Sequence, residues 1–226
     1  MLKNTLNSIS PLDGRYATKL RDLEQYFSEF ALIKNRVLVE INWLIFMSRT
    51  KSLSFVPTLS KNKETSLLKI IDEFSLKDAE QIKKIEAKTN HDVKAVEIFI
   101  GKKLESLNLK KYSEFVHLFC TSEDINNLSY NLMLKGYLDN EFKEINSLLL
   151  KDLKSKSKKW SKLSMLSFTH GQTASPTTLG KEIANFHERI KYHLNLLKSL
   201  NPSGKFNGAV GNYNAHVITD DKVNWQ

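Results

Sequence analysis

The order of hydrophobic and polar positions along this chain is typical of long amphipathic helices. Apolar residues recur at helical spacing and form one stripe: Ile125, Leu128, Leu132, Tyr137, Leu138, Phe142, Ile145, Leu149 and Leu153. Thr121 or Ser122 can cap the start of this helix, and acidic residues at 123 and 124 suit the positive end of its dipole. Nothing stops the pattern before about Trp160, and roughly 40 residues of helix are about 60 Å long. We expect a bundle or other chains to cover such a stripe.

A second long helix is expected to begin at Ser175. Serine is a good N-cap, and Pro176 would then occupy the first helical position, where its missing N–H costs nothing. We expect this helix to continue to Pro202. Earlier in the chain the pattern predicts shorter helices over about 23–49, 62–74, 77–87 and 91–106. No strand-like alternation of any length is evident, so the predicted fold class is all-α, with a helical domain over residues 1–112 and part of a long-helix bundle over residues 113–226.

Composition places the chain among ordinary globular proteins. Hydrophobic residues make up 41% of the 226 residues and charged residues 26%, enough for a real core. The N-terminus lacks the form of a signal peptide, and no apolar run is long enough to span a membrane. A single cysteine, Cys120, gives neither a disulfide framework nor a metal cluster, so a reducing cytoplasm is the simplest location.

The net charge of +9 comes from 34 basic and 25 acidic residues. A nucleic acid partner would suit this excess. However, most of the basic residues are lysines spread along helical faces, and this favours a solvated surface with no nucleic acid partner. A lysine-rich helical protein that binds nucleic acid remains a less favoured alternative. A small, highly charged substrate is also compatible with the charge.

Four polar segments interrupt the lysine- and leucine-rich pattern, at residues 10–16, 89–94, 120–127 and 167–180. In the first, Arg15 offers a guanidinium to a phosphate or carboxylate, with Tyr16 beside it. In the second, Asn90 can cap a helix that carries His91 and Asp92 in its first turn, where free N–H groups attract anions. The alternatives are a turn with surface charge in the first segment and an ordinary capped helix with a surface histidine in the second.

The other two polar segments offer hydroxyls and a histidine. Thr121 and Ser122 at a helix N-terminus would suit a carboxylate or phosphate, whereas a plain cap needs only one hydroxyl. His170 precedes the cap expected at Ser175, so we expect it on a loop at the positive end of a helix. There it could act as a general acid, although a lone histidine is more often structural. A glycine- and asparagine-rich stretch, 204–214, is either a plain loop or a backbone-rich binding surface.

Five segments occurring in this order resemble the bacterial adenylosuccinate lyases of the fumarase and aspartase superfamily. They are Ser-Pro-Leu-Asp-Gly-Arg-Tyr, Thr-Asn-His-Asp-Val-Lys-Ala-Val-Glu, Cys-Thr-Ser-Glu-Asp-Ile-Asn-Asn-Leu, Thr-His-Gly-Gln-Thr-Ala-Ser-Pro-Thr-Thr-Leu-Gly-Lys-Glu and Gly-Ala-Val-Gly-Asn-Tyr-Asn-Ala-His. The likeness runs from Ser8 to Trp225. The Thr-Ser-x-Asp motif occurs across the superfamily, but its combination with the segments at 13–16 and 90–92 is more specific.

The resemblance implies a β-elimination in purine and AMP biosynthesis. Adenylosuccinate would split into AMP and fumarate, and the succinyl-carboxamide ribotide would react in the same way. In the terms of the family, His170 would be the general acid, and Arg15 and Tyr16 would bind the nucleotide. Residues 90–92 would form a second binding segment, and Thr121 and Ser122 would hold the succinyl carboxylates. The resemblance implies no metal and no organic cofactor.

The resemblance also implies a homotetramer built on long central helices, with each site assembled from several subunits. One feature departs from the family. Its catalytic base is a serine on a loop that is roughly Ser-Ser-x-Met-Pro-x-Lys-x-Asn, and this sequence contains neither Ser-Ser nor Met-Pro. We therefore expect the chain to correspond to the N-terminal portion of the enzyme and not to turn over by itself. A lyase acting on argininosuccinate or fumarate, or a folded but inert product, are the alternatives.

Overall fold

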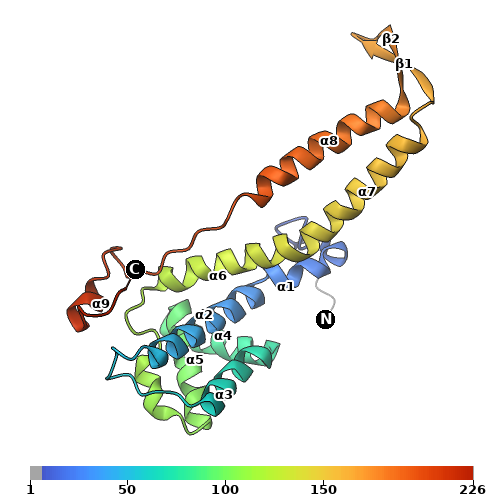
Figure 1. Cartoon of the computed structure of the whole chain (residues 1–226). Helices are drawn as coiled ribbons and strands as arrows, with labels where there is room; N and C mark the ends of the chain where they lie inside the picture. Colours follow the sequence, from blue (N-terminus) through green and yellow to red (C-terminus); the bar gives the residue numbers. More distant parts are fainter. Residues whose placement is uncertain (1–6, 226) are drawn as a thin grey trace. The chain divides into compact units, whose positions relative to one another are not determined.

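The computed structural model describes residues 7–225 and is helical apart from one small sheet and the connecting loops (Figure 1). This confirms the predicted all-α class. The described residues form two compact units: one holds those up to Leu134 together with those from Ser203 onward, and the other holds Lys135–Pro202. The predicted boundary between two domains near residue 112 stays a prediction.

The first unit is built mainly from helices. Its elements are η2 Ala17–Lys19, η3 Arg21–Leu23, α1 Glu24–Phe27, α2 Glu29–Arg49, α3 Lys61–Asp72, α4 Leu76–Thr89, α5 Asp92–Ser106, η4 Lys110–Phe115, α6 Ser122–Tyr137, which extends three residues into the second unit, and α9 Asn214–Thr219. The helix predicted over 23–49 is divided at Ser28, because its hydroxyl accepts a hydrogen bond from the Ala31 N–H at 3.1 Å and caps α2 there. The other predicted helices lie close to α3, α4 and α5.

Helix α2 is the centre of the hydrophobic core of this unit. Val37, Ile41 and Leu44 recur at helical spacing and are fully buried. They belong to one cluster with Phe99 and Ile100 of α5. A helix with one face buried in this way takes most of its stability from packing rather than from intrinsic propensity. The core therefore holds α5 against α2, and α5 begins at one of the predicted polar segments.

The second unit is a pair of helices joined by a β-hairpin. Its elements are η5 Leu138–Phe142, a π-helical turn, α7 Lys143–Lys159, β1 Ser164–Thr169, β2 Gln172–Thr178 and α8 Leu179–Lys198. Helices α7 and α8 pack side by side (Figure 1). Gly180 permits a close approach at their junction, since a Cβ there would lie 2.3 Å from the Ser157 carbonyl oxygen.

The prediction of a helix beginning at Ser175 is wrong. Ser175 and Pro176 lie in β2, and α8 begins at Leu179, where the Thr178 hydroxyl accepts from the Lys181 N–H. A residue before proline favours extended backbone, which suits a strand. A two-stranded sheet also leaves proline room at an edge, where no N–H is required. The expectation that no strands occur is corrected at the same place.

The predicted long helix is present, since residues 122–159 are helical with a π-turn near the middle. Its apolar stripe is only partly covered. Ile125 is fully buried, whereas Ile145 and Leu149 are 58% and 41% exposed, and none of the residues of α7 is buried. Within the described residues, the apolar face of α7 therefore lacks the cover that such a stripe normally has.

Candidate functional site

The predicted binding residues Asn90, His91 and Asp92 line one polar surface pocket with Lys83 and Glu86 of α4. The prediction that Asn90 caps α5 is wrong. Asn90 ends α4 in the left-handed conformation, with φ 56°, and His91 is the N-cap of α5. Asparagine tolerates positive φ better than most residues, which explains its place at this junction.

The side chains of His91 and Asp92 occupy the first turn of α5. The Nδ1 of His91 accepts from the Lys94 N–H at 3.0 Å, which leaves Nε2 as the donor of the neutral ring. Asp92 accepts from the Val93 N–H at 2.8 Å. These side chains therefore take up two N–H groups of the helix end, so an anion would meet the side chains before it met those amides.

Arg36 connects this pocket to the start of α6. It is 6% exposed on the core side of α2. Its Nη2 donates to Asp92 Oδ2 at 2.6 Å and its Nε to Asn126 Oδ1 at 2.9 Å. Burial acts to raise the pKa of Asp92, but the Val93 N–H and the Arg36 charge outweigh it and hold that pKa below its usual value. The structure thus brings the segment at 90–92 together with the helix that begins at Ser122.

Thr121 and Ser122 lie half-buried at the N-terminus of α6. The Thr121 N–H donates to Asp124 Oδ2 at 2.9 Å, so the acidic residue of the first turn fixes the backbone there. Asp124 also receives hydrogen bonds from Asn207 and Gly208 in the loop after Pro202. The glycine- and asparagine-rich stretch therefore lies against the same helix end as the two hydroxyl residues.

Arg15 and Tyr16 lie near the beginning of the described chain and are exposed. The Arg15 guanidinium stands over the Tyr16 ring, 5.1 Å from its centroid. A guanidinium held by a neighbouring ring in this way still presents N–H donors to solvent. The pair is accessible to an anion, as a nucleotide-binding role requires.

His170 lies in the second unit, at the tip of the β-hairpin. Thr169 pairs with Gln172, so His170 and Gly171 form a two-residue turn, with φ values of 54° and 77°. A type I′ turn needs positive φ at both positions, which glycine meets readily. His170 is exposed, and the helix N-terminus expected beside it is not there, since α8 begins only at Leu179. The predicted electrostatic setting of His170 is therefore wrong, while its proposed chemistry is not tested by this.

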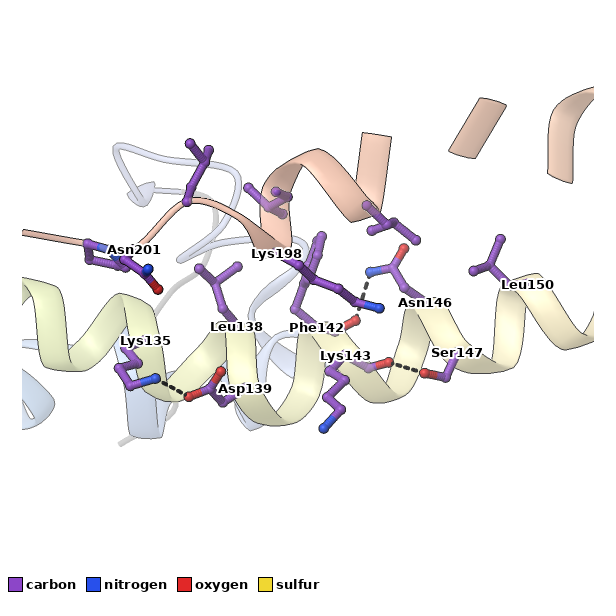
Figure 2. A pocket seen from close by; sticks show the side chains of 14 residues that line it. Lys135, Leu138, Asp139, Phe142, Lys143, Asn146, Ser147, Leu150, Lys198 and Asn201 are labelled. Atoms are coloured by element: carbon purple, nitrogen blue, oxygen red, sulfur yellow. Dashed lines mark hydrogen bonds and ion pairs between the residues drawn. The ribbon is translucent and has the colours of Figure 1, made fainter. Parts of the chain in front are cut away.

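A second pocket, of about 450 Å³, lies within the second unit between the η5–α7 segment and the end of α8 (Figure 2). Apolar residues such as Leu138 and Phe142 line it together with polar ones, and Lys135 forms an ion pair with Asp139 at 2.7 Å. None of the predicted site residues lines it. This pocket therefore belongs to helix packing rather than to the predicted chemistry.

Sequence reasoning missed Arg36 as a site residue. The signal was available: a charged side chain at a position where α2 shows its apolar face indicates a buried partner. Among residues 7–225, no group of three or more His, Cys, Asp or Glu side chains could hold a metal ion. The expectation of a cofactor-free site stays a prediction. None of the helices in the described part of the chain is long and apolar enough to cross a membrane.

Comparison with known proteins gives relatives over the whole chain. The chain is 44% identical to an adenylosuccinate lyase of Legionella pneumophila, covering 100% of this chain and 50% of the relative. It is 43% identical to the adenylosuccinate lyase of Escherichia coli, covering 98% and 49%. The chain thus spans about half the length of the curated relatives that it matches.

Solved structures share the fold at lower identity. A fumarate lyase from Mesorhizobium matches with a TM-score of 0.66 at 17% identity, covering 88% of this chain and 44% of that one. A β-carboxy-cis,cis-muconate cycloisomerase from Acinetobacter calcoaceticus matches with a TM-score of 0.67 at 19% identity, covering 92% and 47%. The model of the family described as Lyase matches residues 14–225. This chain therefore belongs to the lyase family.

Proposed function

We propose that this chain is the N-terminal portion of an adenylosuccinate lyase, which eliminates fumarate from adenylosuccinate and from the succinyl-carboxamide ribotide. The observation that carries the proposal is the identity of 41–44% over essentially the whole chain to relatives named adenylosuccinate lyase. Within the chain, the pocket at residues 90–92 and its link through Arg36 to α6 support a substrate-binding role.

In the proposed reaction, a base removes a proton from the succinyl carbon next to a carboxylate, and the bond between carbon and nitrogen then breaks. His170 protonates the departing nitrogen, because an imidazole can hold and release a proton near neutral pH. Thr121 and Ser122 bind the succinyl carboxylates, and Arg15 binds the phosphate with Tyr16 beside it. The residues at 90–92 bind the remaining part of the substrate.

The base of the family is the part that this sequence does not supply, since it contains neither Ser-Ser nor Met-Pro. We therefore expect substrate binding without turnover from the 226-residue chain alone. The exposed apolar face of α7, with Ile145 and Leu148 at 58% and 60% exposure, favours a homo-oligomer, and the family suggests a tetramer. A cytoplasmic location follows from the proposed purine chemistry.

The test supplies the missing part in trans. The chain is coexpressed with the second half of the Legionella pneumophila relative, and the loss of adenylosuccinate absorbance is followed. We expect turnover from the mixture, none from either half, and loss of turnover with His170→Ala. His193→Ala is the matched control, because His193 is also exposed in the second unit.

A comparison of adenylosuccinate with argininosuccinate as substrates distinguishes the proposed lyase from a related one. Faster turnover of argininosuccinate than of adenylosuccinate would overturn the substrate assignment. Full activity of His170→Ala in the mixture would overturn its role as the acid. Turnover by the 226-residue chain alone would keep the reaction and refute the need for a serine from elsewhere.

A further inference from the structure

The acidic residue of the Thr-Ser-x-Asp motif is a buried carboxylate in the first turn of α6. Asp124 is 0% exposed and accepts from four donors. The N–H groups of Thr121, Asn207 and Gly208 lie at 2.9, 3.1 and 3.1 Å, and the Lys205 Nζ lies at 2.9 Å. A buried carboxylate is costly unless it is paired and hydrogen-bonded. The four donors of Asp124 meet this condition and join two distant segments of the chain.

The same face of α6 binds the loop at two further points. Asn127 accepts from the Lys205 N–H at 2.8 Å and donates to the Lys205 carbonyl at 3.0 Å. Asn131 donates to the Ser203 carbonyl at 2.9 Å. Asp124, Asn127 and Asn131 are spaced three and four residues apart and so share one side of the helix. Helix α6 therefore holds the loop by its backbone.

The glycines of the loop follow from this contact. A Cβ at Gly204 would lie 2.3 Å from the Leu128 Cδ2, and Gly208 has φ +80° where its N–H donates to Asp124. The loop is fixed from its other side by Phe206, whose ring centroid lies 4.5 Å from that of Trp43. The loop is thus a built part of the first unit rather than a plain connection.

We propose that Asp124 is a positioning residue for the carboxylate-binding end of α6. It fixes the Thr121 backbone and holds Asn207 and Gly208 beside it, so that the site is assembled before the substrate arrives. The inference rests on the proposed function, in which Thr121 and Ser122 bind the succinyl carboxylates. Lys205 offsets the charge of Asp124, so the pair does not repel a dianionic ligand.

The electrostatics agree with this role. Burial acts to raise the pKa of Asp124, but the hydrogen bond from Lys205 and the N–H groups of Thr121 and Asn207 outweigh it and keep that pKa below its usual value. The carboxylate is therefore ionised at neutral pH and can keep all four donors. A preassembled loop lowers the ordering cost of binding, which is the general reason that such residues raise affinity.

The test compares Asp124→Asn with Glu123→Gln in the 226-residue chain. Both changes remove one negative charge from the first turn of α6, but Glu123 is exposed, and its side chain makes none of the loop hydrogen bonds described above. Amide exchange of Asn207 and Gly208 and the Trp43 indole resonance report loop position. The Trp160 indole, in the other unit, is the internal reference. Adenylosuccinate is the probe, and its affinity is read from the Thr121 and Ser122 amide resonances.

We expect Asp124→Asn to expose the two loop amides to exchange, to shift the Trp43 resonance and to weaken adenylosuccinate binding by about tenfold or more. Glu123→Gln should leave the Trp43 resonance in place and should change the amide exchange and the affinity by no more than about twofold. The double variant Asp124→Asn with Lys205→Met removes any effect of an unpaired lysine, and we expect its affinity to stay low.

The outcomes distinguish the positioning role of Asp124 from the existence of the carboxylate site. Unchanged affinity in Asp124→Asn, with the loop released, overturns the positioning role alone. Normal affinity in the double variant also overturns it, because the loss would then come from the stranded lysine. Absence of any ligand-dependent shift in the unmodified chain overturns the carboxylate site itself, and the role of Asp124 with it.

Discussion

Replacement of Arg36 by methionine is the most informative change to the first unit. Methionine keeps much of the apolar stem of the side chain against α2, so the change removes mainly the guanidinium. The loss breaks the hydrogen bonds to Asp92 and Asn126, at 2.6 and 2.9 Å. Because these bonds join the start of α5 to the first turns of α6, we expect a lower free energy of unfolding and a less well fixed pocket at 90–92.

The magnitude follows from the burial of the two partners. Breaking a fully buried ion pair costs roughly 3–5 kcal/mol, and a hydrogen bond to a charged group is worth roughly 1.5–3 kcal/mol. The Arg36 side chain is 8% exposed, but that of Asp92 is 43% exposed and can regain water. We therefore expect a loss of about 2–3 kcal/mol, near the lower of these ranges.

The assay is urea unfolding followed by Trp43 and Trp225 fluorescence in a Trp160→Phe background, so that the signal comes from the first unit. The matched control is Arg49→Met. Arg49 forms a two-point ion pair with Glu64, at 2.8 and 2.5 Å, but its side chain is 64% exposed. Exposed pairs contribute little, so this variant should unfold nearly as the parent does. Equal losses in the two variants would refute the argument from burial.

Three further changes test other parts of the structure. Gly180→Ala should destabilise the second unit by about 1–3 kcal/mol in thermal unfolding, because its Cβ would meet the α7 backbone. Gly101→Ala should not destabilise α5, because a Cβ there would lie 4.0 Å from the Ser113 side chain, at an ordinary van der Waals distance. His216 is 1% exposed with both ring nitrogens unpaired, and burial lowers its pKa, so the free energy of unfolding should fall as pH drops below 6.5. His216→Phe should remove that fall and raise the free energy of unfolding in urea by about 1 kcal/mol. Burial acts to lower the pKa of His117, but the hydrogen bond and charge of Glu40 outweigh it and hold that pKa above 6.5. The stability that this pair contributes should therefore be lost as pH rises from 6.5 through the raised pKa. Glu40→Gln should flatten the pH profile of unfolding.

The helices of the first unit could be predicted from the sequence because their signals are local. Apolar residues at helical spacing indicated α3, α4 and α5 within a few residues. The hairpin at 164–178 could not be predicted by the same rules, since Ser175 and Pro176 also form a good helix start. Its own signal was the two-residue turn at His170 and Gly171, between segments that contain serine and threonine.

The candidate site likewise contains residues that the sequence indicated and contacts that only the structure showed. Motifs in the sequence were enough to nominate residues 90–92, Thr121 and Ser122, because a short polar segment at a helix start is made of residues that are neighbours in the sequence. Only the tertiary structure showed that Arg36 joins two of these segments and that Asp124 holds the loop at 205–208. Those contacts span 56 to 90 residues of sequence in the case of Arg36. Pairing over such distances is decided by how the core packs, because a single sequence gives the partners of a buried charge no fixed spacing.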